Sequence, residues 1–167
     1  SFHLSADLVE ITREEPFEDT VRALSKWLSK DIDIMPVPAS ARLPMYSTWY
    51  SFHQNMTAEE IEAECKIAKE LGFSTIIVDD GWQTEDNNRG YALCGEYEVA
   101  KKKFPDMKEH VARVHEIGMK YMMWLSVPFI GNRSKDWERF KDKILRFDEG
   151  SDAGEVDPRY PEVREFL

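Results

Sequence analysis

The sequence predicts an α/β fold in which successive strand–helix units build a parallel sheet. Two segments carry helix start and stop signals, and an apolar run of strand length follows each of them at once, at residues 74–78 and 119–127. A third strand candidate, residues 44–52, precedes the first helix. This alternation is typical of parallel sheets, and right-handed crossovers then bring the ends of all three strands to one face.

The first helix is predicted to begin at Thr57. Thr57 and Glu60 have the spacing of a capping box, in which both side chains accept hydrogen bonds from backbone amides left free at the helix start. Met56 and Ile61 are spaced as the hydrophobic staple that flanks such a cap. Gly72 supplies the left-handed residue that ends the helix, so the next strand follows directly.

The second helix repeats this pattern. Asp106 and Glu109 mark its start, Gly118 ends it, and the strand that follows contains Trp124. Between the second strand and this helix lie residues 81–105, a polar stretch of the length that usually carries function in a compact domain.

Later segments predict one more complete helix. Trp137, Phe140 and Ile144 recur at helical spacing, which indicates a helix over residues 135–147. Residues 149–157 are acidic and rich in turn residues, and we expect a loop there.

The N-terminal part is predicted to be separate from the sheet. Residues 17–30 have the spacing of an amphipathic helix, and the proline-bearing residues 35–42 indicate a linker. We therefore expect residues 1–42 to be a helical connecting segment and linker from a preceding domain, and residues 43–167 to be a partial domain.

Composition excludes several classes of partner. A net charge of −10 over 167 residues argues against nucleic acid and anionic membranes, which both require a basic surface. No apolar run approaches the length of a membrane span. Cys65 and Cys94 are far apart, and we interpret them as structural thiols, which is compatible with a reducing compartment such as the cytoplasm.

The segment most suggestive of a site is Asp79-Asp80-Gly81-Trp82, at the end of the buried strand. In α/β sheets, the carboxyl ends of the strands are where ligands bind. Two carboxylates beside an indole suit a sugar, because carboxylates accept hydrogen bonds from hydroxyl groups and the ring offers a flat apolar surface. A solvated turn and a metal site are the alternatives for this segment alone.

Neighbouring strands favour the sugar interpretation. Trp49, Trp82 and Trp124 fall at or just past three successive strand ends, so three aromatic surfaces are predicted to converge with the carboxylate pair. No histidine has a second ligand at metal-site spacing, so neither a metal nor a cofactor is expected. His53 is a further candidate for substrate contact.

These motifs together resemble the retaining α-galactosidases of the clan that includes melibiase-like and raffinose-synthase-like enzymes. The matching segments are residues 44–49, 79–82, 95–97, 103–105, 118–124 and 156–163. The resemblance implies a (β/α)₈ TIM barrel, of which this chain would be the N-terminal portion, about three βα units. It also implies that Asp79 and Asp80 bind galactose hydroxyls, with Trp49 and Trp124 as walls of the pocket.

The resemblance also implies what this portion lacks. Retaining hydrolysis needs a nucleophilic carboxylate and an acid/base carboxylate, which the family places at the ends of strands four and six. We expect the chain to be truncated before strand four, to contain no catalytic residue and to be inactive alone. Its expected partners are a galactoside or related oligosaccharide, the rest of the barrel and, in some assemblies, a second copy. A non-catalytic carbohydrate-binding or degenerate barrel module and a metal-dependent barrel hydrolase are the alternatives.

Overall fold

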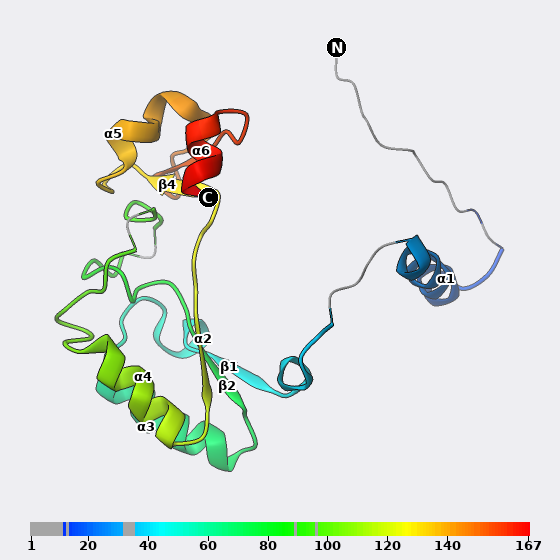
Figure 1. The fold of residues 1–167 in the computed structure, drawn as a ribbon, viewed down its shortest axis with the longest axis horizontal. Coiled ribbons are helices and arrows are strands. Elements are labelled where there is room, and N and C mark those ends of the chain that lie inside the picture. The colour runs from blue at the N-terminus through cyan, green and yellow to red at the C-terminus, as the bar shows by residue number, and fades with distance from the viewer. Residues whose placement is uncertain (1–11, 13, 32–35, 89, 96) are drawn as a thin grey trace. The chain divides into compact units, whose positions relative to one another are not determined.

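The computed structural model describes residues 12, 14–31, 36–88, 90–95 and 97–167. The chain divides into two compact units, residues 1–38 and 39–167, which we describe separately. In the first unit, helix α1 (Phe17–Asp31) confirms the predicted amphipathic helix (Figure 1). Its apolar stripe residues remain between 37% and 45% exposed: Val21, Leu24, Trp27 and Leu28.

The second unit contains the predicted parallel sheet, in the order β1-β2-β3. Ile76, at the centre of β2, lies opposite Tyr46 on one side and Tyr121 on the other. The β-branched residues of β2 suit a pleated strand covered on both faces. The strands are β1 (Met45–Ser47), β2 (Thr75–Val78) and β3 (Lys120–Met123).

Both outer strands are shorter than the sequence predicted. The strand expected within residues 44–52 is confirmed as β1, but it ends at Ser47, and the chain turns at Thr48 into the short helix α2 (Trp49–Phe52). After β3 the amide of Trp124 still donates to the Val78 carbonyl, at 2.9 Å, before the chain leaves the sheet. A short 3₁₀ helix, η1 (Ala39–Arg42), precedes β1.

The two crossover helices are α3 (Ala58–Glu70) and α4 (Met107–Glu116). The hydroxyl of Thr57 and the carboxylate of Asp106 accept hydrogen bonds from the backbone amide three residues on, at 3.3 Å and 2.9 Å. The predicted N-caps are therefore confirmed at both starts. The second half of the predicted capping box differs, because the Glu60 carboxylate accepts from the Thr57 hydroxyl at 2.8 Å instead of from a backbone amide.

Both helices end in the same way. After α3, the Gly72 amide donates to Lys69 and the Phe73 amide donates to Ala68, which is the hydrogen-bond pattern of a Schellman motif. The amides of Gly118 and Met119 repeat this pattern after α4. Gly72 and Gly118 have φ of +91° and +87°, as the motif requires, and the predicted glycine stops are confirmed.

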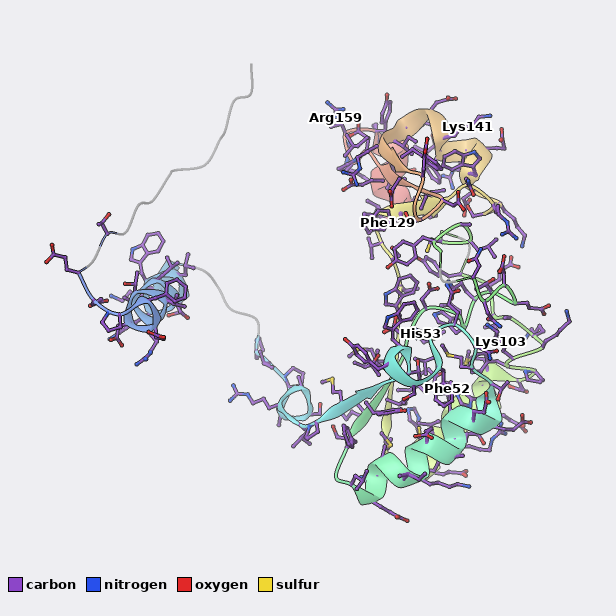
Figure 2. The ribbon with its side chains drawn as sticks, turned by 180° about the vertical axis from the view of Figure 1, so that it is seen from behind. Phe52, His53, Lys103, Phe129, Lys141 and Arg159 are labelled. Atoms are coloured by element: carbon purple, nitrogen blue, oxygen red, sulfur yellow. The ribbon has the colours of Figure 1, made fainter. Side chains whose placement is uncertain are left out.

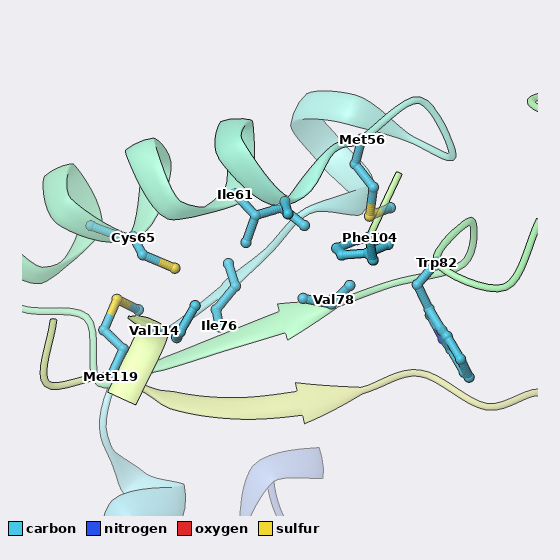
Figure 3. Packing of buried hydrophobic residues seen from close by; sticks show 11 residues of the cluster. Met56, Ile61, Cys65, Ile76, Val78, Trp82, Phe104, Val114 and Met119 are labelled. Atoms are coloured by element: carbon cyan, nitrogen blue, oxygen red, sulfur yellow. The ribbon is translucent and has the colours of Figure 1, made fainter. Parts of the chain in front are cut away.

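The main core lies between the two helices and the sheet (Figure 3). Met56 and Ile61, the predicted staple pair, are both fully buried there. Ile61 and Cys65 on α3 point toward Ile76 on β2 in the close view. The buried members of this cluster are Met56, Ala58, Ile61, Cys65, Ala68, Ile76, Val78, Trp82, Phe104, Val114 and Met119.

Residues 129–167 form a second, antiparallel sheet, which the sequence did not predict, together with short helices. Its strands, in the order β4-β6-β5, are β4 (Phe129–Gly131), β5 (Ile144–Asp148) and β6 (Ala153–Val156). Its helices are α5 (Trp137–Phe140), the 3₁₀ helix η2 (Lys141–Lys143) and α6 (Pro161–Phe166). Figure 1 shows this part gathered at the far end of the segment that leaves β3.

The predicted helix over residues 135–147 is therefore wrong beyond Lys143, and the predicted loop over residues 149–157 contains a strand. Ile144 enters the small core from β5 rather than from a helix. That packing depends on Gly154 of the facing strand, where an added Cβ would lie 2.8 Å from Ile144. No helix among the described residues is long and apolar enough to cross a membrane.

Candidate functional site

The carboxyl ends of β1 and β2 meet around Asp79. The amide of Thr48 donates to the Ile77 carbonyl at 3.0 Å, and the Thr48 hydroxyl accepts from the Asp79 amide at 3.0 Å. Ser47 donates to Oδ2 of Asp79 at 3.2 Å, and its hydroxyl also accepts from the Trp49 amide at 3.3 Å. A single serine hydroxyl therefore links the first predicted carboxylate to the backbone of the first predicted tryptophan.

Asp80 is the more buried carboxylate, at 2% exposed. Both of its oxygens accept from side-chain amides at 2.6 Å, Oδ2 from Gln54 and Oδ1 from Gln83. Burial raises the pKa of Asp80, the two amide hydrogen bonds oppose that shift, and the charge of Asp79 adds to it. Since a carboxylate has about four acceptor directions, two amides leave Asp80 able to accept further hydrogen bonds.

A buried lysine holds the backbone around Asp80. Lys103 is 8% exposed, and its ammonium donates to the carbonyls of Gln54 at 2.6 Å and Gly81 at 2.9 Å, and to Oδ1 of Asn87 at 2.6 Å. Figure 2 labels Lys103, Phe52 at the end of α2 and His53, the residue that follows α2. The ammonium therefore joins the β1 exit, the β2 exit and the long loop.

Gly81 allows the backbone after Asp80 to lie directly against the backbone of Gln54. Its φ is +118°, and an added Cβ would lie 2.5 Å from the Cα atom and 2.7 Å from the carbonyl oxygen of Gln54. These are backbone contacts, which a neighbouring side chain cannot relieve by moving. Only glycine lets the Asp79-Asp80 turn pack against Gln54 in this way.

The two outer tryptophans stand at the ends of β1 and β3, and both are partly exposed. The ring of Trp49 meets His53 edge-on, with centroids 5.0 Å apart. His53 has a φ of +50°, and its Nδ1 is buried without a hydrogen-bond partner among the described residues. The ring of Trp124 lies against Tyr91 of the long loop, with centroids 5.9 Å apart.

Trp82 does not offer the open aromatic surface that the sequence predicted. It is 3% exposed, belongs to the main core and stacks on Tyr97 with centroids 6.0 Å apart. Its indole N–H donates to the Trp124 carbonyl at 2.9 Å. A buried indole needs such a partner, so Trp82 supports the backbone of Trp124 from inside the fold.

Other titratable groups have structural positions. His110 is fully buried, and its Nδ1 lies 2.8 Å from Glu62 Oε1. Cys65 and Cys94 are free and buried, and burial raises their pKa values to about 11 and about 12. No group of three or more potential metal ligands occurs in the described part of the chain.

Sequence reasoning missed three residues that build the surroundings of Asp80: Gln54, Gln83 and Lys103. Lys103 has no local signal of burial in the sequence, because the three oxygens that its ammonium reaches lie 16 to 49 residues away. The roles of Gln54 and Gln83 depend on the side-chain amides reaching Asp80 across turns, and no local pattern marks such contacts.

Solved structures share this fold. The crystal structure of the GH36 α-galactosidase AgaA from Geobacillus stearothermophilus has a TM-score of 0.67 at 20% identity, covering 75% of this chain and 18% of that one. The galactosidase domain of AgaSK gives 0.65 at 24% identity, with the same coverage. The second unit therefore has the fold of part of a (β/α)₈ TIM-barrel catalytic domain.

Sequence comparison identifies the family. The Melibiase family matches residues 34–156, which is most of the chain, and the chain belongs to this family. Among its relatives, α-galactosidase 1 of Pediococcus pentosaceus is 33% identical over 82 residues, or 47% of this chain. α-Galactosidase Mel36A of Lactobacillus acidophilus is 28% identical over 104 residues, or 60% of this chain. The chain spans only 11% and 14% of these two relatives.

Proposed function

We propose that this chain forms the galactose-recognising part of a retaining α-galactosidase. The observation that carries the proposal is the position of Asp79 and Asp80 at the end of β2, between Trp49 and Trp124 at the ends of the two flanking strands. Membership of the Melibiase family and the α-galactosidase names of its relatives support the proposal.

In this proposal the carboxylates accept hydrogen bonds from the sugar hydroxyls, and the two tryptophans form the walls of the pocket. Asp79 is partly exposed and meets the sugar directly. Asp80 is reached when the partly exposed Gln83 side chain moves from Oδ1 and a sugar hydroxyl takes its place. Trp82 takes no part in contact and holds Trp124 in position.

Hydrolysis of the glycosidic bond would need two carboxylates besides Asp79 and Asp80. A retaining double displacement uses a nucleophile and an acid/base about 5–5.5 Å apart, and Asp79 and Asp80 are assigned to binding. We therefore propose that later strands of the barrel supply both catalytic groups and that this chain alone hydrolyses nothing. The low coverage of the relatives' length supports this division.

The test is Asp80→Ala in the intact enzyme, assayed on an aryl α-galactoside. We expect loss of measurable activity, because the sugar loses an acceptor at its most buried contact. Asp142→Ala, which removes an exposed carboxylate from η2, is the matched control and should keep wild-type turnover. Near wild-type turnover in Asp80→Ala would contradict the assignment. Galactoside binding without turnover in the wild-type protein would instead favour a non-catalytic carbohydrate-binding module.

A further inference from the structure

A row of three aromatic rings leads away from the carboxylate pair. Tyr91 lies between Trp124 and Phe129, with centroid distances of 5.9 Å and 5.6 Å and an interplanar angle of 35° in each case. All three side chains are partly exposed. Figure 2 labels Phe129, the first residue of β4, where the chain enters the second sheet. We call these three residues the aromatic row.

The backbone of Tyr91, the middle residue of the aromatic row, is held by hydrogen bonds on both sides. The Tyr91 amide donates to the Ser151 carbonyl at 2.8 Å, and its carbonyl accepts from the Cys94 amide at 2.9 Å. An added Cβ at Gly131 of β4 would lie 2.3 Å from the Tyr91 carbonyl oxygen, so β4 packs directly on this backbone. The second sheet therefore holds Tyr91 in place, although Tyr91 belongs to the long loop.

The aromatic row also adjoins the carboxylate pair. The same Gln54 amide nitrogen that donates to Asp80 at 2.6 Å donates to the carbonyl of Gly90 at 3.2 Å, one residue before Tyr91. Burial raises the pKa of Tyr91, and the charges of Asp80 and Asp79 add to that shift. The residue before Tyr91 therefore shares a hydrogen-bond donor with Asp80.

These features suit a second sugar ring. The exposed parts of the three rings offer apolar surface to the C–H groups of a pyranose, and the Tyr91 hydroxyl has no hydrogen-bond partner among the described residues. We propose that the aromatic row binds the sugar next to the galactose in an oligosaccharide substrate, with Tyr91 as the central contact. This proposal rests on the proposed function, since it places the galactose at Asp79 and Asp80.

The experiment compares two substrates in the intact enzyme. Raffinose carries further sugar rings beyond its galactose, whereas methyl α-galactoside carries only a methyl group. Tyr91→Leu keeps the apolar volume and removes the flat ring. We expect it to lower kcat/KM for raffinose by roughly tenfold, the scale of one lost aromatic contact. Its kcat/KM for methyl α-galactoside and its inhibition constant for galactose should stay within about twofold of wild type.

Two further variants separate recognition from folding. Tyr91→Trp keeps a flat ring and should retain most of the activity on raffinose. Tyr160→Leu makes the same substitution as Tyr91→Leu at a tyrosine that is 43% exposed beside α6, and both substrates should be unaffected. Equal losses on both substrates in Tyr91→Leu would mean that the ring only packs against protein, and would overturn the proposal. An unchanged kcat/KM for raffinose would overturn it as well. If the wild-type enzyme cleaves neither substrate, the proposed function itself fails.

Discussion

The side-chain amide of Gln54 donates to Oδ2 of Asp80 across 2.6 Å, and both residues are 2% exposed. This contact joins the turn after β1 to the exit of β2 and fixes the orientation of the carboxylate. A hydrogen bond to a charged group contributes about 1.5–3 kcal/mol, so the contact is strong enough to determine the geometry of the site.

Gln54→Leu removes this donor and keeps a similar side-chain volume. We expect the affinity of the intact enzyme for galactose to fall by roughly tenfold or more, because Asp80 loses its orienting partner. Inhibition by galactose measures the effect. Asn55→Leu is the matched control at the exposed neighbouring amide. Equal affinity in Gln54→Leu and Asn55→Leu would show that Gln54 does not orient the carboxylate.

The affinity for galactose should also depend on pH through Asp80. Burial raises its pKa above the ordinary value of 3.8, so the group becomes protonated at a higher pH than an exposed aspartate. Galactose affinity should therefore fall, on acidification, at a midpoint above 3.8. Gln54→Leu removes a hydrogen bond that lowers this pKa, so its midpoint should lie higher still. Calorimetric titration with galactose across the acidic range checks both midpoints, and a midpoint in Gln54→Leu at or below that of wild type would contradict the prediction.

Lys103→Met should destabilise the fold. The substitution leaves two buried carbonyls and the Asn87 side chain without their donor, and such losses reduce the free energy of unfolding by about 3 kcal/mol. Unfolding in urea measures this change. The neighbouring Lys102, whose side chain is 83% exposed and paired with Glu85, provides the control. Lys102→Met should have little effect, because exposed ion pairs contribute little.

Comparing Gly81→Ala with Gly72→Ala separates the cost of a positive φ from the cost of a steric clash with neighbouring backbone atoms. Both glycines have positive φ, but an added Cβ meets nothing within 4 Å at Gly72 and meets the Gln54 backbone at 2.5 Å at Gly81. Gly72→Ala should lower the free energy of unfolding by about 1 kcal/mol, the cost of a left-handed alanine. Gly81→Ala should lower it by roughly 3 kcal/mol or more, since backbone atoms must also move. Equal losses in urea unfolding would argue against the tight contact.

His110 should make stability fall at mildly acidic pH. Burial lowers its pKa below the ordinary 6.5, although Glu62 opposes the shift. The unfolded chain then binds a proton that the folded protein does not, so stability is full above 6.5 and is lost as pH falls toward the lowered folded value. The pKa of Glu62 is lowered from 4.5 by Arg113 and His110 despite its burial, so its own contribution is lost only at more acidic pH. The difference in unfolding free energy between pH about 7.5 and about 5.5 should shrink in His110→Gln.

The crossover helices were predictable because their signals are local. Thr57, Asp106, Gly72 and Gly118 each act through hydrogen bonds within a few residues, and the structure has a cap or a stop at every one of them. The parallel sheet followed from the two helices, since a crossover helix forces the next strand to run in the same direction.

The second sheet was not predictable because its pairing is not local. Ile144 has helical spacing to Phe140, but it packs over Gly154 of β6, a contact that only the folded chain reveals. Trp82 illustrates the same limit within the site. An indole just past a strand suggests an exposed ring, yet its N–H reaches the Trp124 carbonyl, 42 residues away, and the ring becomes core.

The order β1-β2-β3 has a consequence for how the protein is made. Each new strand adds beside the one synthesised just before it, so the sheet can grow on the ribosome without waiting for distant segments. The Schellman motifs after α3 and α4 end each helix a few residues before the next strand, β2 or β3, begins. β3, the last of the three to be synthesised, lies at an edge of the sheet.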